Sequence, residues 1–323
     1  DFVFVGSIGR PDLLEKAAGA RGTAESGARA MFHSLERFKT LPDYVQVWPA
    51  HGAGSACGKG LGAIPSSTVG YEKLFNPALP YESEEAFVEY LLADQPEVPP
   101  YFREMKRVNK VGPALLRTLS QPVNLPVERL ADVIEAGAQV LDVRNREAYA
   151  DGYVPGTLNI PVEALAQWAG WLVDYEQPLY LIGPSTELRE VTRVLHKLGV
   201  DEIAGYFDSD EIELHALNHE RYEVATPDEL AEAILNDEVR LVDVRAESEW
   251  AEGRLPHAHH VMLGTLPERL DEVVNGKPIV LQCRTGNRSA IAASIVRAAG
   301  GARVINMDGG YRDWAAAGLP IEK

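Results

Sequence analysis

The chain has 323 residues, which is long enough for two or three domains that each bury a core. Hydrophobic residues make up 46% and charged residues 24%, and an excess of Asp and Glu (48) over Lys and Arg (31) gives a formal net charge of -17. This acidic balance argues against a nucleic-acid partner or an anionic membrane surface, and no apolar run approaches the roughly 18 residues of a membrane span. The two cysteines, Cys57 and Cys283, lie far apart, which fits a reducing compartment. We therefore expect a cytoplasmic protein without a disulfide framework.

The first element in chain order is an apolar run at residues 2–5, directly after Asp1. It predicts a strand without a charged or flexible lead-in, so we expect the chain to begin inside a domain. A Gly-rich stretch at 52–62, a helical pattern at 84–92 and a Pro-rich break at 96–100 follow. These features indicate a first unit that differs from the rest of the chain.

The remainder of the chain contains a repeat with a period of about one hundred residues. The segment LDVR at 141–144 is echoed by VDVR at 242–245, and an aromatic residue, a glycine and a proline follow in step. Both copies alternate apolar strands with helical patterns, such as 188–198 and 290–299, which is typical of α/β domains with parallel sheets. The predicted domains are 1–120, 121–220 and 221–323.

The candidate chemistry lies in a loop of the second copy, between a buried-type strand at 279–281 and an Ala-rich helix. Open α/β sheets bind ligands where a strand's carboxyl end meets a helix's amino end, because backbone N–H groups and the helix dipole favour an anion there. A thiol at Cys283 is therefore expected to ionise readily and act as a nucleophile. The alternative, that Cys283 only fills space in the core, is disfavoured because its neighbours in the sequence are polar. The candidate substrate-binding residues that follow it are Arg284, Thr285, Gly286, Asn287, Arg288 and Ser289.

This pattern resembles the rhodanese family, whose active loop is a cysteine, four residues and an arginine, behind an upstream Asp-Val-Arg strand. The match extends over 226–319 and includes the segment DGGYRDW at 308–314. The resemblance implies that the Cys283 thiolate takes up a sulfane sulfur as a persulfide and passes it to an acceptor thiol, with no cofactor. It also implies that Asp243 and Arg245 brace the loop, although a purely structural ion pair explains them equally well.

The first copy resembles the same fold without its reactive group. Gly183 stands at the position of Cys283, and the sequence PSTE at 184–187 adds a negative charge and no arginine. We expect this copy to be catalytically inert. It is either a docking module or a structural duplicate, since a fold alone does not assign a role.

Residues 1–120 resemble the C-terminal half of a metallo-β-lactamase-fold domain, as found in persulfide dioxygenases and glyoxalase II-type hydrolases. The resemblance rests on Asp1 with FVGSIGRPDL at 4–13 and on WPAHGAGS at 48–55. It implies that Asp1 and His51 stand at metal-ligand positions for iron or zinc, and that the His-rich motif with the remaining ligands lies upstream. Two ligands cannot hold a catalytic metal tightly, so metal binding is expected in the complete domain.

The predicted fold is therefore α/β, with the C-terminal part of a metallo-β-lactamase αββα domain followed by two rhodanese-like domains with parallel sheets. The leading function is a sulfurtransferase attached to a persulfide dioxygenase-like domain in hydrogen sulfide and persulfide metabolism. Its expected partners are small sulfur donors and thiol acceptors such as thiosulfate, glutathione and other low-molecular-weight persulfides. The oligomeric state is open, with a homodimer among the options.

Other functions remain open at this point. One is a metal-dependent hydrolase of the glyoxalase II type with accessory rhodanese modules, and another is a scaffold without turnover. A phosphatase is disfavoured, because related phosphatase loops are longer by one residue to fit a tetrahedral phosphate, whereas four residues separate Cys283 from Arg288.

Overall fold

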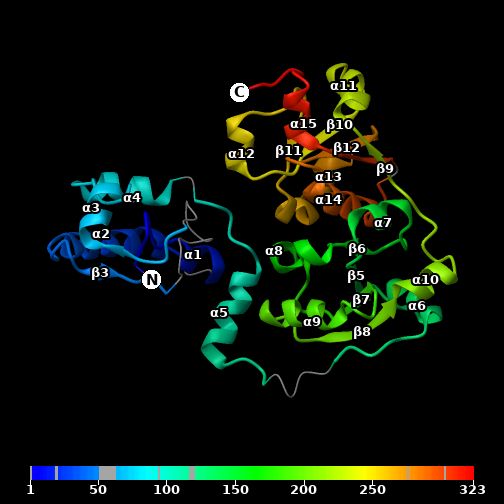
Figure 1. Ribbon diagram of the computed structural model, residues 1–323, viewed down its shortest axis with the longest axis horizontal. Helices are drawn as coiled ribbons and strands as arrows, with labels where there is room; N and C mark the ends of the chain where they lie inside the picture. The colour runs from blue at the N-terminus through cyan, green and yellow to red at the C-terminus, as the bar shows by residue number, and fades with distance from the viewer. Residues whose placement is uncertain are drawn as a thin grey trace. The chain divides into compact units, whose positions relative to one another are not determined.

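The computed structural model divides into two compact units, Asp1–Lys106 and Arg107–Lys323. Helix α5 (Tyr101–Val111) runs across the point of division (Figure 1). Among the residues that the structure describes, none of the helices combines the length and the apolar character that crossing a membrane requires. The described residues are 2–18, 21–50, 63–93, 95–115, 121–274, 276–301 and 303–323.

A small helical core organises the first unit. Helix α2 (Thr23–Lys39) begins after Gly22, whose φ of 74° suits a residue without a side chain. It packs against α4 (Glu84–Leu92), where the rings of Phe32 and Phe87 lie 5.5 Å apart between centroids. Strand β1 pairs with β2 and β3 with β4, both antiparallel. The remaining elements are β1 (Val3–Phe4), β2 (Ser7–Ile8), α1 (Leu13–Ala18), β3 (Gln46–Val47), β4 (Ser67–Thr68) and α3 (Val69–Phe75).

The first repeated copy forms a parallel sheet in the strand order β6-β5-β7-β8. Strand β6 follows β5 in the chain and pairs on one side of it, whereas β7 pairs on the other side, so the strand order reverses at β5. Its elements are η2 (Val127–Arg129), α6 (Leu130–Glu135), β5 (Gln139–Asp142), α7 (Arg146–Asp151), β6 (Leu158–Asn159), α8 (Val162–Leu172), β7 (Leu179–Gly183), α9 (Leu188–Lys197), β8 (Ile203–Asp208) and α10 (Ser209–Leu214).

The second copy repeats this arrangement in the order β11-β10-β12-β13-β9, again with parallel pairing. The predicted α/β fold with parallel sheets is thereby confirmed, and the predicted helices at 188–198 and 290–299 correspond to α9 and α14. Its elements are β9 (Glu223–Ala225), α11 (Pro227–Leu235), β10 (Arg240–Asp243), α12 (Glu247–Glu252), β11 (His259–His260), η3 (Leu263–Arg269), α13 (Leu270–Val273), β12 (Ile279–Gln282), α14 (Asn287–Ala298), β13 (Val304–Met307) and α15 (Gly310–Ala316).

Helix α14 joins the two copies. Its buried residues run without a break from Ser289 to Val296, as in a helix that protein encloses all round. It contacts β12 and β13 of its own sheet, and also β6 and α7 of the first copy. The hydroxyl of Ser294 accepts a hydrogen bond from the N–H of Asn159 at 3.0 Å. Figure 1 shows the two copies side by side, the first in green and the second in yellow to red, and a continuous apolar cluster extends through both.

Arg297, near the end of α14, adds polar bonds to the same interface. Its Nε donates to the hydroxyl of Tyr153 at 2.6 Å, and its Nη2 donates to Glu220 at 2.8 Å. Tyr153 in turn stacks on Tyr149 in the first copy, with ring centroids 4.8 Å apart. The guanidinium therefore ties the end of α14 to the neighbouring copy.

We predict that Arg297→Ala lowers the free energy of unfolding by about 1.5–3 kcal/mol, because hydrogen bonds to a charged group are lost from a partly buried site. Urea unfolding of the whole chain measures the change. Arg193→Ala is the matched control, since Arg193 is exposed and pairs with Glu190 along its own helix, and it should cost about 0.5 kcal/mol or less. Equal effects of the two substitutions would contradict the interface role of Arg297.

Candidate functional site

Cys283 lies where β12 ends and the loop to α14 begins. Strand β12 is fully buried between β10 and β13, and Cys283 itself is only 1% exposed. The N–H of Gly286 donates a hydrogen bond to the Cys283 sulfur at 3.2 Å, and the hydroxyl of Ser289 approaches it at 3.5 Å. Donors from the loop and from the first turn of α14 thus converge on the sulfur, which favours negative charge there.

The loop turns into α14 at Gly286, and this position accepts no side chain. Its φ of 96° is in the left-handed region that favours glycine. A Cβ atom added there would lie 2.6 Å from Oδ1 of Asp308 and 2.7 Å from Nη1 of Arg146. The residue whose amide donates to the sulfur is therefore packed directly against these two charged groups.

The turn between β13 and α15 supports the start of the loop. Gly310 has a φ of 54°, and a Cβ atom there would overlap the carbonyl oxygen of Cys283. The N–H of Tyr311 donates to that carbonyl at 2.8 Å, and the N–H of Arg312 donates to the carbonyl of Arg284 at 3.1 Å. The backbone at the reactive cysteine is thereby fixed from this side.

Arg288 is held by an acidic partner that the sequence analysis missed. Its two terminal nitrogens donate to the two carboxylate oxygens of Glu249, on α12, at 2.6 and 2.8 Å. Burial opposes the charge of Arg288, but the Glu249 carboxylate and, to a smaller extent, the Cys283 sulfur hold the guanidinium pKa above its ordinary value. Burial likewise opposes the charge of Glu249, but the bonds from Arg288 hold the pKa of that carboxyl below its usual range.

The other predicted loop residues face outwards. Arg284 and Asn287 are exposed, and Thr285 is half-buried. Within the part of the chain that the structure describes, Arg284 forms no ion pair. It is therefore a cation beside Cys283 that an anionic ligand can approach.

Asp243 and Arg245 form a buried ion pair behind the loop. Nε and Nη2 of Arg245 donate to the carboxylate, with the shortest distance 2.6 Å, and Nη2 also donates to the carbonyl of Gly253 at 2.8 Å. The guanidinium lies 4.3 Å from the ring centroid of Tyr311, the residue whose N–H holds the Cys283 carbonyl. The pair thus reaches the loop through Tyr311.

The first copy keeps this ion pair but has no room for a reactive side chain. Arg144 donates to Asp142 at 2.6 Å and to the carbonyl of Gly152 at 2.9 Å, as Arg245 does in the second copy. A Cβ atom at Gly183 would lie 2.6 Å from a methyl group of Val143. The buried Asp and Arg are therefore features of both copies and do not depend on the cysteine.

The candidate metal ligands Asp1 and His51, together with Cys57, lie outside the described residues. Within the described ranges, no group of three or more His, Cys, Asp or Glu side chains could hold a metal ion. The described residues therefore do not by themselves form the metal site that the resemblance to a metallo-β-lactamase implies.

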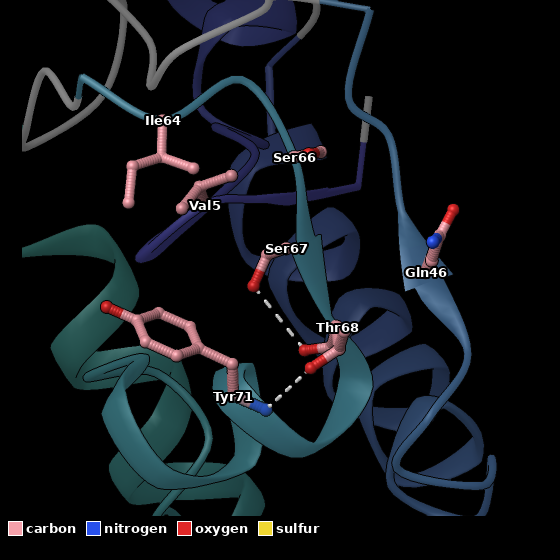
Figure 2. A pocket seen from close by; sticks show the side chains of 7 residues that line it. All are labelled: Val5, Gln46, Ile64, Ser66, Ser67, Thr68 and Tyr71. Atoms are coloured by element: carbon pink, nitrogen blue, oxygen red, sulfur yellow. Dashed lines mark hydrogen bonds between the residues drawn. The ribbon is translucent and has the colours of Figure 1, made fainter.

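The first unit contains a cavity of about 300 Å³, shown in Figure 2. The hydroxyl of Thr68 accepts a hydrogen bond from the N–H of Tyr71 at 3.2 Å, which caps α3 at this cavity. The described residues that line the cavity include no carboxylate, histidine or cysteine, so its serine and threonine hydroxyls have no general base among them that would activate a nucleophile. The lining residues are Val5, Gln46, Ile64, Ser66, Ser67, Thr68 and Tyr71.

Comparison with known proteins supports the second copy as the reactive domain. The family described as rhodanese-like domain matches residues 226–317. A sulfurtransferase of Allochromatium vinosum is 38% identical over 85 residues, which are 26% of this chain and 79% of that protein. The thiosulfate sulfurtransferase GlpE of Glaesserella parasuis serovar 5 is 29% identical over 103 residues, which are 32% of this chain and 95% of that protein.

A solved structure extends the similarity beyond this domain. A metallo-beta-lactamase from Staphylococcus aureus subsp. aureus COL is 44% identical, with a TM-score of 0.56, and the match covers 64% of this chain. The chain spans 57% of the length of that protein. The predicted combination of a C-terminal rhodanese domain with similarity to a metallo-β-lactamase is thereby confirmed. Through residues 226–317, the chain belongs to the family of rhodanese-like sulfurtransferases.

Proposed function

We propose that this protein transfers sulfane sulfur through a persulfide on Cys283. The observation that carries the proposal is the convergence of the Gly286 N–H and the Ser289 hydroxyl on the buried Cys283 sulfur. Such donors stabilise a thiolate before the reaction and a persulfide anion after it. The similarity of residues 226–317 to sulfurtransferases supports the same chemistry.

In the first half-reaction, the Cys283 thiolate attacks the outer sulfur of a donor such as thiosulfate. A sulfur–sulfur bond forms to Cys283, the sulfur–sulfur bond within the donor breaks, and sulfite leaves with the bonding electron pair. The exposed guanidinium of Arg284, which forms no ion pair among the described residues, provides attraction for an anionic donor beside the thiolate. Arg288 is less available for this task, because Glu249 already occupies both of its terminal nitrogens.

In the second half-reaction, an acceptor thiolate attacks the terminal sulfur of the Cys283 persulfide. The new sulfur–sulfur bond forms on the acceptor, the bond to Cys283 breaks, and the Cys283 thiolate is regenerated. Small thiols such as glutathione are the proposed acceptors. No net oxidation or reduction occurs over the cycle, so the domain requires no redox cofactor.

We also propose the domain boundaries near residues 121 and 221, with the first copy as a rhodanese-like domain that does not carry sulfur. The repeated strand order and the repeated ion pairs of Asp142 and Asp243 support this division. In a protein that carries a complete metallo-β-lactamase domain, the proposed role is persulfide oxidation with iron or zinc, in a cytoplasmic pathway of sulfide metabolism. A glyoxalase II-like hydrolase remains the alternative for that domain.

Cys283→Ser should abolish sulfur transfer from thiosulfate to a thiol, because the hydroxyl is a far weaker nucleophile towards sulfur. The stability should change by about 1 kcal/mol or less, since little volume is altered. Steady-state assays with thiosulfate and urea unfolding measure the two effects. Cys57→Ser is the matched control, because Cys57 lies outside the matched residues 226–317, and it should retain full transfer. Transfer that survives in Cys283→Ser would exclude the proposed mechanism.

Glu249→Gln should destabilise the protein by about 1–3 kcal/mol at pH 7, because it removes the carboxylate from a partly buried pair with Arg288. The pKa of Glu249 is lowered in the folded state. The contribution of its carboxylate to the free energy of unfolding is therefore present above the ordinary Glu pKa of about 4.3 and is lost as pH falls through the lower pKa of the folded state. The difference between wild type and variant should therefore be largest near pH 7 and shrink at acidic pH.

Urea unfolding at a series of pH values tests this pH dependence. Glu252→Gln, which changes an exposed carboxylate on the same helix, provides the control and should show almost no effect at any pH. A stability loss in Glu249→Gln that is independent of pH would show that the ion pair with Arg288 does not account for it.

A further inference from the structure

Arg146 belongs to the first copy but extends to the reactive loop of the second. It is the first residue of α7, and its Nη1 donates to Oδ1 of Asp308 at 2.8 Å across 162 residues of sequence. Its side chain is 25% exposed, so the pair is partly removed from water. A partly buried pair is screened less by solvent and salt than a surface pair.

This ion pair lies directly against Gly286. A Cβ atom on Gly286 would be 2.7 Å from Nη1 of Arg146 and 2.6 Å from Oδ1 of Asp308. The N–H of Gly286 is the group that donates to the Cys283 sulfur at 3.2 Å. A continuous series of contacts therefore connects Arg146 in the first copy to the reactive sulfur in the second.

Asp308 also leads the turn that fixes the loop from the other side. Three residues later, the N–H of Tyr311 donates to the carbonyl of Cys283 at 2.8 Å. Displacement of Asp308 would therefore disturb both the amide that faces the sulfur and the support of the cysteine backbone.

The local charges favour a structural task for Arg146 over the direct attraction of an anionic donor. Its Nε donates to Glu147 at 2.7 Å while its Nη1 donates to Asp308, so two carboxylates oppose one guanidinium. Arg284, which is exposed and unpaired among the described residues, is better suited to meet an anion. Arg146 can instead hold Asp308 in place against Gly286.

We propose that Arg146 is a positioning residue for sulfur transfer by Cys283, so that the copy without a cysteine completes the site of the copy that has one. It holds Asp308 against Gly286 and thereby keeps the loop amide in line with the sulfur. This inference rests on the proposed function. A misplacement of about 1 Å at a group that meets developing charge can cost a large factor in rate.

The test is a set of variants of the whole chain, assayed for transfer from thiosulfate to an uncharged thiol acceptor. Arg146→Ala and Asp308→Asn should each lower kcat/KM by about tenfold, mainly through kcat. Because both substitutions remove the same contact, the kcat/KM of the double variant should be no more than about twofold below that of either single variant. Arg146→Lys should recover activity to within about threefold of wild type. Arg193→Ala, an exposed arginine of the same copy, should match wild type.

A second readout does not depend on turnover. The rate at which iodoacetamide alkylates Cys283, followed by mass spectrometry of the peptide, should fall several-fold in Arg146→Ala and be restored in Arg146→Lys, because it reports how well the loop stabilises the thiolate.

Several results would overturn the inference. One is a kcat/KM of Arg146→Ala within about twofold of wild type, and another is a double variant in which the two losses multiply. The inference also fails if Arg146→Lys does not recover activity, or if the loss of activity only follows the unfolded fraction of the protein at the assay temperature. Failure of the proposed function is recognised separately. In that case the wild-type protein itself transfers no sulfur, or Cys283→Ser still transfers it, and the proposed role of Arg146 is then excluded as well.

Discussion

The enclosure of helix α14 is the constraint on which the reactive site depends. Its residues from Ser289 to Val296 are all buried, and many are Ala or Ser, which allows close approach on every side. One sheet can cover only one face of a helix. The first copy covers part of the remainder, through β6 and α7, and the bond between Asn159 and Ser294 fixes the approach. Because Gly286 caps this helix, burial of α14 also determines where the loop amide lies relative to the Cys283 sulfur.

Around the sulfur, most charges are paired and serve as supports. Arg245 pairs with Asp243, Arg288 with Glu249 and Arg146 with Asp308, each with a shortest nitrogen-to-oxygen distance of 2.8 Å or less. The first of these pairs is buried and the other two are partly buried. Breaking a buried pair is costly, because one charge is left without a partner. Two neutral donors, the Gly286 amide and the Ser289 hydroxyl, contact the sulfur itself, and the charge of Arg288 interacts with it as well.

The sequence was sufficient to predict the parallel α/β fold, the repeat and the position of Cys283, because these follow from local patterns of apolar strands and a loop of polar residues. Glu249 was missed although a signal existed. The first copy has Ala148 at the equivalent position, just as it has Gly183 for Cys283 and Leu188 for Arg288, so the three groups are absent together. Arg146 could not be found in this way, because its contact with Asp308 depends on how two domains pack. The roles of the candidate site residues remain predictions, and the metal ligands Asp1 and His51 lie outside the described ranges.

Direct detection of the loaded protein tests whether Cys283 carries sulfur. The whole chain is incubated with thiosulfate, freed of the donor, trapped with an alkylating reagent and digested for mass spectrometry. If Cys283 carries sulfur, the peptide containing Cys283 gains the mass of a single sulfur atom in addition to the alkyl group, and a later incubation with glutathione removes this sulfur before trapping. A peptide of unchanged sulfur content at Cys283, or an extra sulfur found on Cys57 in its place, would show that Cys283 is not the sulfur carrier.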